Sequence, residues 1–268
     1  MTPPVALSIA GSDSGGGAGI QADMRTFAAL GVFGTTAITC VTAQNTMGVK
    51  AVQVLAASLV REQVEAVVED MAVTGAKTGL LATAEMVELV ACLVGERLLP
   101  PLVVDPVFVA TSGQSLAKTG AVRAYREHLF PVAAVVTPNL QEAGVLCNEE
   151  VTTLKAAREA ARRLGELASV VVVKGGHLAD TSASVDVIWD GAACWEIAQP
   201  RVPTANTHGS GCTFSAAIAA GLASGLPVEE SIRRANAFVH RAIEGGATWS
   251  LGKGAGPLDH FGWAEKGE

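Results

Sequence analysis

The sequence predicts an α/β protein with a mostly parallel central sheet and helices on both faces. Apolar runs of strand length alternate with segments of helical periodicity along almost the whole chain, a pattern typical of βαβ units. Several of the strand runs are continuously apolar, as expected for parallel strands that are covered on both sides. Hydrophobic residues make up 49% of the chain and charged residues only 17%, so the material for a large core is present. Because no linker or repeat interrupts the pattern, we expect residues 1–268 to form a single domain.

Strands are expected where β-branched and aliphatic residues run together. The expected strands are Val5–Ala10, Thr35–Ala43, Val49–Leu55, Gly75–Leu81, Leu102–Val104, Ala133–Val136, Ser169–Val173, Val185–Trp189 and Ala192–Ile197. The last two flank Asp190-Gly191, a dipeptide typical of a tight hairpin turn.

Helices are expected where apolar residues recur every three or four positions. The first follows Gly19 and carries Ile20, Met24, Phe27 and Leu30 on one face. The others are expected over 60–71, 85–99, 212–224 and 228–244, with loop after Trp249.

Polar motifs follow the ends of several expected strands. They are the glycine-rich segment Gly11–Gly19 and the single residues Asp105, Asn139 and Lys174. Ligands of open α/β sheets bind outside the carboxyl ends of the strands. The sequence therefore predicts an active site at this edge of the sheet.

The most informative segment is Thr207–Thr213, in which two glycines flank a serine directly before an alanine-rich helix. Such a turn directs backbone N–H groups and the positive end of the helix dipole at one point, which suits phosphate or developing negative charge. The same dipole favours the thiolate form of Cys212. The structural alternative is an ordinary glycine-rich loop before a packing helix.

Several other classes of protein are excluded or disfavoured. A P-loop is excluded because no lysine follows the glycines of Gly15–Gly19, and the dinucleotide pattern lacks its acidic residue after the next strand. No G-x-S-x-G elbow of a hydrolase occurs. A net charge of −7 without a basic block argues against nucleic acid and anionic membranes as partners, and no apolar run is long enough to span a bilayer. Five cysteines without a C-x-x-C pair indicate a reducing cytoplasm.

The remaining polar residues fit phosphoryl transfer, which needs cation coordination, a phosphate cradle and a group that handles the acceptor hydroxyl. Asn139 and Glu142 lie one helical turn apart and could order Mg²⁺ and its waters. Alternatively, the same two residues form the capping box of an ordinary helix start. Asp105 and Lys174 also have structural alternatives, as a turn residue and a solvated lysine.

These motifs identify a family. The chain resembles the hydroxymethylpyrimidine/phosphomethylpyrimidine kinases of thiamin biosynthesis, which are members of the ribokinase-like superfamily. The resemblance extends in order over Ala10–Asp23, Val41–Thr46, Lys77–Leu81, Val104–Val107, Thr137–Asn139 with Glu142, Lys174–His177 and Gly209–Thr213.

The resemblance implies a ribokinase-like kinase, usually dimeric, that uses MgATP to phosphorylate 4-amino-5-hydroxymethyl-2-methylpyrimidine and then its monophosphate. The family positions that line the pyrimidine pocket correspond to Gly11, Asp23, Gln44, Leu80 and Val107. Cys212 matches the position that activates the acceptor oxygen, and Gly209, Ser210 and Gly211 match the anion hole. Asn139, Lys174 and Thr207 would serve the nucleotide, and Asp105 and Glu142 the Mg²⁺.

Three positions depart from the family pattern: Leu80 stands where methionine is common, Gln114 where aspartate is frequent, and Asn236 where lysine is expected. The alternative functions are a pyridoxal/pyridoxine kinase and a regulatory protein that binds the pyrimidine without turnover. Gln44 favours the aminopyrimidine, because an amide both donates to and accepts from its edge. Segments 15–19 and 111–120 are candidate lids.

Overall fold

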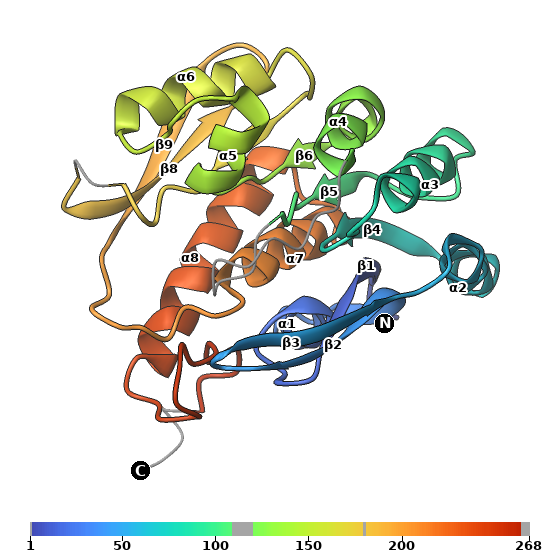
Figure 1. Ribbon diagram of the computed structural model, residues 1–268, viewed down its shortest axis with the longest axis horizontal. Helices are drawn as coiled ribbons and strands as arrows, with labels where there is room; N and C mark the ends of the chain where they lie inside the picture. The colour runs from blue at the N-terminus through green and yellow to red at the C-terminus, as the bar shows by residue number, and fades with distance from the viewer. Residues whose placement is uncertain (1, 109–119, 179–180, 264–268) are drawn as a thin grey trace.

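The protein is described by a computed structural model over residues 2–108, 120–178 and 181–263. Within these residues the strands form one nine-stranded sheet in the order β3-β2-β1-β4-β5-β6-β7-β8-β9 (Figure 1). The strands are β1 (Val5–Asp13), β2 (Phe33–Asn45), β3 (Gly48–Val54), β4 (Val73–Thr78), β5 (Leu102–Val104), β6 (Val135–Val136), β7 (Val171–Val173), β8 (Ala183–Trp189) and β9 (Cys194–Pro200). The six central strands from β2 to β7 are parallel, and β3, β8 and β9 pair antiparallel with their neighbours.

Helices cover both faces of this sheet. They are α1 (Gly19–Ala29), α2 (Ala57–Asp70), α3 (Ala84–Gly95), α4 (Ala121–Ala124), α5 (Leu140–Cys147), α6 (Leu154–Leu164), α7 (Ser210–Ala223) and α8 (Val228–Gly246). A π-helical turn over Tyr125–Leu129 and a 3-10 turn over Phe130–Val132 continue α4. Helices α2 to α6 pack on one core, and α1, α7 and α8 pack on the other (Figure 1). The predicted fold class is confirmed.

Strand and helix boundaries differ from the predictions mainly where the chain enters or leaves the carboxyl edge of the sheet. Strands β1 and β2 run on to Asp13 and Asn45, so residues expected in loops there hold ladder positions. The hairpin after β8 is longer than a two-residue turn, because Asp190 accepts hydrogen bonds from the N–H groups of Ala192 and Ala193 before β9 begins. No motif noted above predicts α6, although its buried residues Ala157, Ala160, Ala161 and Leu164 recur at helical spacing and its other side carries Lys, Arg and Glu.

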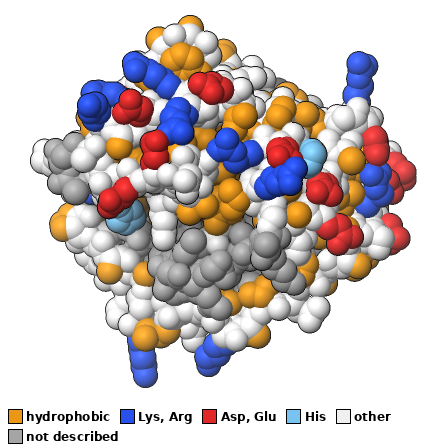
Figure 2. Space-filling view, turned by 45° about the horizontal axis from the view of Figure 1, so that its top comes forward, with side chains coloured by type: hydrophobic (Ala, Val, Ile, Leu, Met, Phe, Trp, Pro, Cys, Tyr) orange, Lys and Arg blue, Asp and Glu red, His pale blue; other side chains and the backbone are white. Residues whose placement is uncertain are grey.

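The surface carries charges of both signs. On the face shown in Figure 2, Lys and Arg side chains lie interspersed with Asp and Glu. Several form ion pairs one helical turn apart, such as Arg233 with Glu229 at 2.8 Å. Among the described residues, none of the helices combines the length and apolar character needed to cross a membrane.

Candidate active site

A cavity of about 1460 Å³ opens at the carboxyl ends of the parallel strands. This is the edge at which the sequence places the polar motifs. The predicted site residues that line it are Gly11, Gln44, Leu80, Asp105, Val107, Asn139, Glu142, Lys174, Thr207, Gly209, Ser210, Gly211 and Cys212. Of the predicted set, only Asp23 does not line the cavity.

The turn before α7 brings two glycine-rich segments into contact. Gly209 is the N-cap of α7 and has φ +87°, a left-handed conformation that favours glycine. A Cβ at Gly209 would overlap the carbonyl oxygen of Gly17 and lie 3.0 Å from its carbonyl carbon. Helix α7 begins at Ser210, so the N–H groups of its first turn, including those of Gly211 and Cys212, have no intrahelical acceptor. The Ser210 N–H donates to the Thr207 carbonyl oxygen at 3.1 Å, and the anion hole as a whole stays a prediction.

Cys212 lies in the first turn of α7 and is partly exposed to the cavity. Burial of its sulfur among protein groups raises the pKa of the thiol to about 12, and the nearby carboxylates of Asp23 and Asp105 add to this effect. The Lys77 cation and the Gly19 N–H act in the opposite direction but do not compensate. Burial thus opposes the effect of the helix dipole and favours the thiol form of Cys212 in the ligand-free protein, so the thiolate stays a prediction.

A buried ion pair lies beside the turn Gly209–Cys212, called the anion turn below. Lys174 Nζ lies 2.8 Å from Asp105 Oδ1, and Asp105 is only 2% exposed. Burial lowers the pKa of Lys174, but the carboxylates of Asp105 and Glu142 outweigh it and raise that pKa. A Cβ at Gly211 would lie 3.0 Å from Lys174 Nζ, so this ammonium is next to the N–H groups of α7. Lys174 is thus paired with a carboxylate rather than freely solvated.

Asn139 and Glu142 form the capping box of α5. The Asn139 side chain accepts from the Glu142 N–H at 2.9 Å, and Glu142 Oε2 accepts from the Asn139 N–H at 2.8 Å. The structural alternative for this pair is therefore confirmed, although both residues also line the cavity. Burial and the nearby Asp105 raise the pKa of Glu142 to about 7, despite the opposing effect of the Lys174 cation.

Asp23 differs from the expectation that it contacts substrate. It lies on the buried face of α1, where its Oδ2 is 3.0 Å from Lys77 Nζ and 2.5 Å from Ser8 Oγ. The side chains of Asp23 and Lys77 are both completely buried. Burial lowers the pKa of Lys77, but the neighbouring carboxylates of Asp23 and Asp105 raise it above its usual value. Asp23 is thus the counter-ion of a lysine in the core beneath the cavity.

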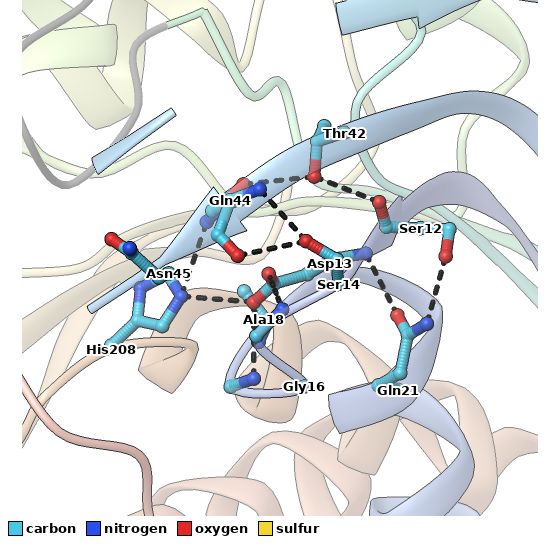
Figure 3. A network of polar contacts seen from close by, with 12 residues as sticks. Ser12, Asp13, Ser14, Gly16, Ala18, Gln21, Thr42, Gln44, Asn45 and His208 are labelled. Carbon is cyan, nitrogen blue, oxygen red and sulfur yellow. Dashed lines mark hydrogen bonds and ion pairs between the residues drawn. The ribbon is translucent and has the colours of Figure 1, made fainter. Parts of the chain in front are cut away.

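Asp13 is a site residue that the sequence analysis did not assign. Its Oδ1 accepts from the Gly15 N–H at 2.8 Å, and its Oδ2 accepts from Gly17 and Ala18 at 3.0 and 2.9 Å (Figure 3). One carboxylate therefore fastens the glycine-rich loop. An aspartate directly before Ser-Gly-Gly-Gly is the available signal, because Asp side chains commonly accept from N–H groups a few residues on.

His208 is the second unassigned residue. Its Nε2 lies 3.1 Å from Asp13 Oδ2 and 3.2 Å from Gln44 Nε2, so it connects the loop, the end of β2 and the anion turn (Figure 3). The spacing of 195 residues between Asp13 and His208 leaves no local signal of this contact.

The opposite end of the cavity carries a neutral amide where the family pattern has lysine. Asn236 Nδ2 donates to Asp186 Oδ2 at 2.9 Å, and Gln199 Nε2 donates to Asn236 Oδ1 at 2.8 Å. Asp186 also accepts from the Gly175 N–H at 2.9 Å. Gln114 and residues 111–119 of the second candidate lid lie outside the described residues.

Solved structures with this architecture define the class. The chain superposes on a Bacillus subtilis pyridoxal kinase in an ADP complex with TM-score 0.89 at 36% identity, covering 98% of this chain and 99% of that chain. It also superposes on a phosphomethylpyrimidine kinase from Clostridium difficile 630 with TM-score 0.78 at 34% identity, covering 90% and 99% of the two chains. The fold is that of a ribokinase-like kinase.

The sequence comparisons define the family within this class. The family model described as phosphomethylpyrimidine kinase matches residues 13–259. The hydroxymethylpyrimidine/phosphomethylpyrimidine kinase of Rhizobium meliloti (strain 1021) is 47% identical over 259 residues, which are 96% of this chain and 97% of that protein. The chain therefore belongs to the phosphomethylpyrimidine kinase family.

Proposed function

We propose that this protein transfers phosphoryl groups from ATP to 4-amino-5-hydroxymethyl-2-methylpyrimidine and then to its monophosphate, forming the diphosphate used in thiamin biosynthesis. Family membership supports the substrate, and one observation supports the chemistry. A single cavity joins an amide-bearing apolar wall, the glycine turn of α7 and a lysine–carboxylate pair. These are the parts that a hydroxymethyl acceptor and a triphosphate donor require.

The substrate end suits a flat aromatic ring with one polar edge. Leu80 forms an apolar cluster with Cys40 and Ala82, and Val107 packs against it. A Cβ at Gly11 would lie 2.7 Å from Cys40 Sγ, so glycine keeps the backbone and this cluster close together. The Gln44 amide offers both a donor and an acceptor to the edge of the ring.

The transfer end combines positive charge with an orienting thiol. The N–H groups of Gly209 and Gly211 and the Lys174 ammonium stabilise negative charge on the moving phosphoryl group, whereas the Ser210 N–H already donates to the Thr207 carbonyl oxygen. Cys212, protonated in the ligand-free protein, orients the acceptor hydroxyl rather than removing its proton in advance. This agrees with phosphoryl transfer through a loose transition state, in which positioning and electrostatics dominate.

Asn139, Lys174 and Thr207 would bind the nucleotide, and Asp105 and Glu142 would hold Mg²⁺ through its waters. The described residues contain no group of three or more His, Cys, Asp or Glu ligands, and a pair of carboxylates is what Mg²⁺ takes when phosphates supply other positions. When bound, Mg²⁺ neutralises charge on the transferring phosphates. The residues of the chain itself would bind the phosphates and orient the acceptor hydroxyl.

The protein would act as a homodimer in the cytoplasm. All five cysteines are free, which suits a reducing compartment. Strands β2 and β3 expose Phe33, Val41 and Val52, and Met47 is exposed between them, so this edge of the sheet carries apolar side chains that contact with a second copy would bury.

The test is ADP release with MgATP and, in turn, the hydroxymethyl aminopyrimidine, its monophosphate and pyridoxine. We expect two equivalents of ADP per aminopyrimidine and one per monophosphate. Release of only one equivalent from the aminopyrimidine would refute the second phosphorylation. A regulatory binding protein would retain the ligand and release no ADP.

The second candidate function is pyridoxine phosphorylation. The observation that favours it is the superposition on a Bacillus subtilis pyridoxal kinase, whose TM-score exceeds that of the Clostridium difficile enzyme. A higher kcat/KM with pyridoxine than with the aminopyrimidine would establish this alternative.

A further inference from the structure

The side-chain amide of Gln44 is held at both ends by neighbours of known hydrogen-bonding character. Gln44 Nε2 lies 3.2 Å from His208 Nε2, and Gln44 Oε1 lies 3.2 Å from Thr42 Oγ1 (Figure 3). The nitrogen and oxygen of a primary amide have nearly the same shape, and their hydrogen-bond partners decide which end is which. The protons of these partners therefore fix the orientation of the amide.

His208 presents a donor. Its Nε2 is 3.1 Å from Asp13 Oδ2, a carboxylate that accepts three backbone N–H bonds and has no proton to give. Although burial raises the pKa of Asp13, hydrogen bonds from His208 and the loop outweigh it and lower that pKa, so the group is ionised at neutral pH. A lone pair on His208 Nε2 would face this negative charge. The proton therefore resides on Nε2, and a Gln44 NH₂ group at 3.2 Å would set donor against donor.

Thr42 presents an acceptor. Its Oγ1 lies 2.9 Å from the backbone carbonyl oxygen of Ser12, which can only accept. The single hydroxyl proton of Thr42 is used in that bond, so its oxygen has only lone pairs for Gln44. An amide oxygen at 3.2 Å would then set acceptor against acceptor.

A half-turn of the amide resolves both conflicts. We propose that Gln44 holds its oxygen toward His208 and its nitrogen toward Thr42. His208 and Thr42 thereby set the register of the aminopyrimidine, that is, which atoms of the ring edge face the oxygen and which face the nitrogen of the amide. The His208 ring is itself fixed, because Asp13 holds its Nε2 and a Cβ at Gly17 would collide with its Cδ2. His208 and Thr42 are positioning residues, which act on substrate through Gln44.

The register has a consequence for the reacting group, and it rests on the proposed function. The amide oxygen accepts from the 4-amino group of the ring, and the amide nitrogen donates to the adjacent ring nitrogen. The 5-hydroxymethyl group neighbours the amino group, so it lies beyond the oxygen, on the His208 side. His208 directly precedes Gly209–Cys212, so this orientation directs the hydroxyl to the anion turn. The reverse amide would direct it toward Thr42.

The orientation is tested first without substrate, by nuclear Overhauser effects in isotopically labelled wild-type protein. We expect the Gln44 side-chain amide protons to show stronger contacts to the Thr42 side chain than to the His208 ring protons. Stronger contacts to the His208 ring protons would overturn the proposal. This readout is independent of the reaction, so it stands or falls separately from the proposed function.

The register is tested by comparing kcat/KM for the aminopyrimidine with that for 5-hydroxymethyl-2-methylpyrimidine, which lacks the amino group. In the wild type we expect a preference of about 10-fold or more for the aminopyrimidine, because the analogue leaves the substrate-facing lone pair of the amide oxygen without a donor. His208→Phe keeps a planar ring without the donor and should reduce the preference to about 2-fold, whereas His208→Gln restores an N–H and should retain most of it.

Thr42→Val tests the other end of the amide and should also reduce the preference, which keeps the proposal testable if His208→Phe does not fold. Ser14→Ala is the matched control, because among the described residues Ser14 Oγ hydrogen-bonds the backbone N–H and carbonyl of Gln44, at 2.8 Å each, and not its side-chain amide. It should keep the wild-type preference. A wild-type preference in folded His208→Phe or Thr42→Val, or an equal loss in Ser14→Ala, would overturn the proposal. Failure of the wild type to phosphorylate either pyrimidine would instead refute the proposed function.

Discussion

Replacing Gly209 by alanine tests whether the contact between the two glycine-rich segments builds the anion hole. Alanine at φ +87° costs on the order of 1–2 kcal/mol in any context. At this position its Cβ would also overlap the Gly17 carbonyl oxygen and lie 3.3 Å from Ala18 Cα. Restoring ordinary contacts requires the segments to separate by on the order of 1 Å. Displacement of that size at a reacting centre costs about 100-fold in rate.

Gly31→Ala separates this displacement from backbone strain. Gly31 has φ +73°, but a Cβ there would meet no atom within 4 Å. Gly31→Ala should therefore lower the Tm by about 2–8 °C through strain alone and leave kcat/KM unchanged. In ADP-release kinetics we expect Gly209→Ala to lose about 100-fold in kcat/KM. Wild-type kcat/KM in folded Gly209→Ala would refute the reasoning, as would an equal loss of activity in Gly31→Ala.

Four further predictions concern three side chains in the cavity. Cys212→Ala should abolish most turnover and leave the Kd of the aminopyrimidine largely intact in calorimetry, whereas wild-type kcat would contradict its role. The iodoacetamide alkylation rate of Cys212, followed by mass spectrometry, should still rise between pH 9 and 10, because its pKa is raised to about 12; a plateau below pH 9 would show a thiolate. Gln44→Met should weaken the aminopyrimidine more than pyridoxine, and equal losses would show that Gln44 is not the selector. Binding of MgATP at pH 6 should release a proton, because the Glu142 pKa of about 7 leaves this group protonated until a cation binds; calorimetry in buffers of different ionisation enthalpy measures the release, which Glu142→Gln should remove.

The fold could be predicted because its signals are local. Continuously apolar runs identify buried parallel strands, and the glycine-rich and polar motifs follow strand ends at one edge of the sheet. This rule predicts which edge of the sheet carries the site. The family resemblance adds which residues line the cavity. Helix α6 was missed because the predicted helices rest on larger apolar side chains, whereas its buried side is mostly alanine; its alternation of alanine with Arg, Glu and Lys is nevertheless strongly amphipathic.

The missed features depend on residues that are distant in sequence. Asp23 and Lys77 are 54 positions apart, and nothing near either one indicates that they neutralise each other in the core. The expected thiolate of Cys212 was a local argument from the dipole of α7. Burial and the carboxylates of Asp23 and Asp105, supplied by other elements, outweigh it.

In both Cys212 and Glu142 the protonated form is favoured, and the physical reasons are related. Both are buried acids whose pKa is raised by desolvation and by the negative charge of Asp105, and a lysine opposes the shift in each case. The two lysines are already paired, Lys77 with Asp23 and Lys174 with Asp105, so the ligand-free site has little positive charge left to stabilise further anions. Protons on Cys212 and Glu142 limit the negative charge in this confined space. Under the proposed function, a divalent cation held by Glu142 would change that balance, whereas Cys212 would retain its proton and orient the acceptor hydroxyl.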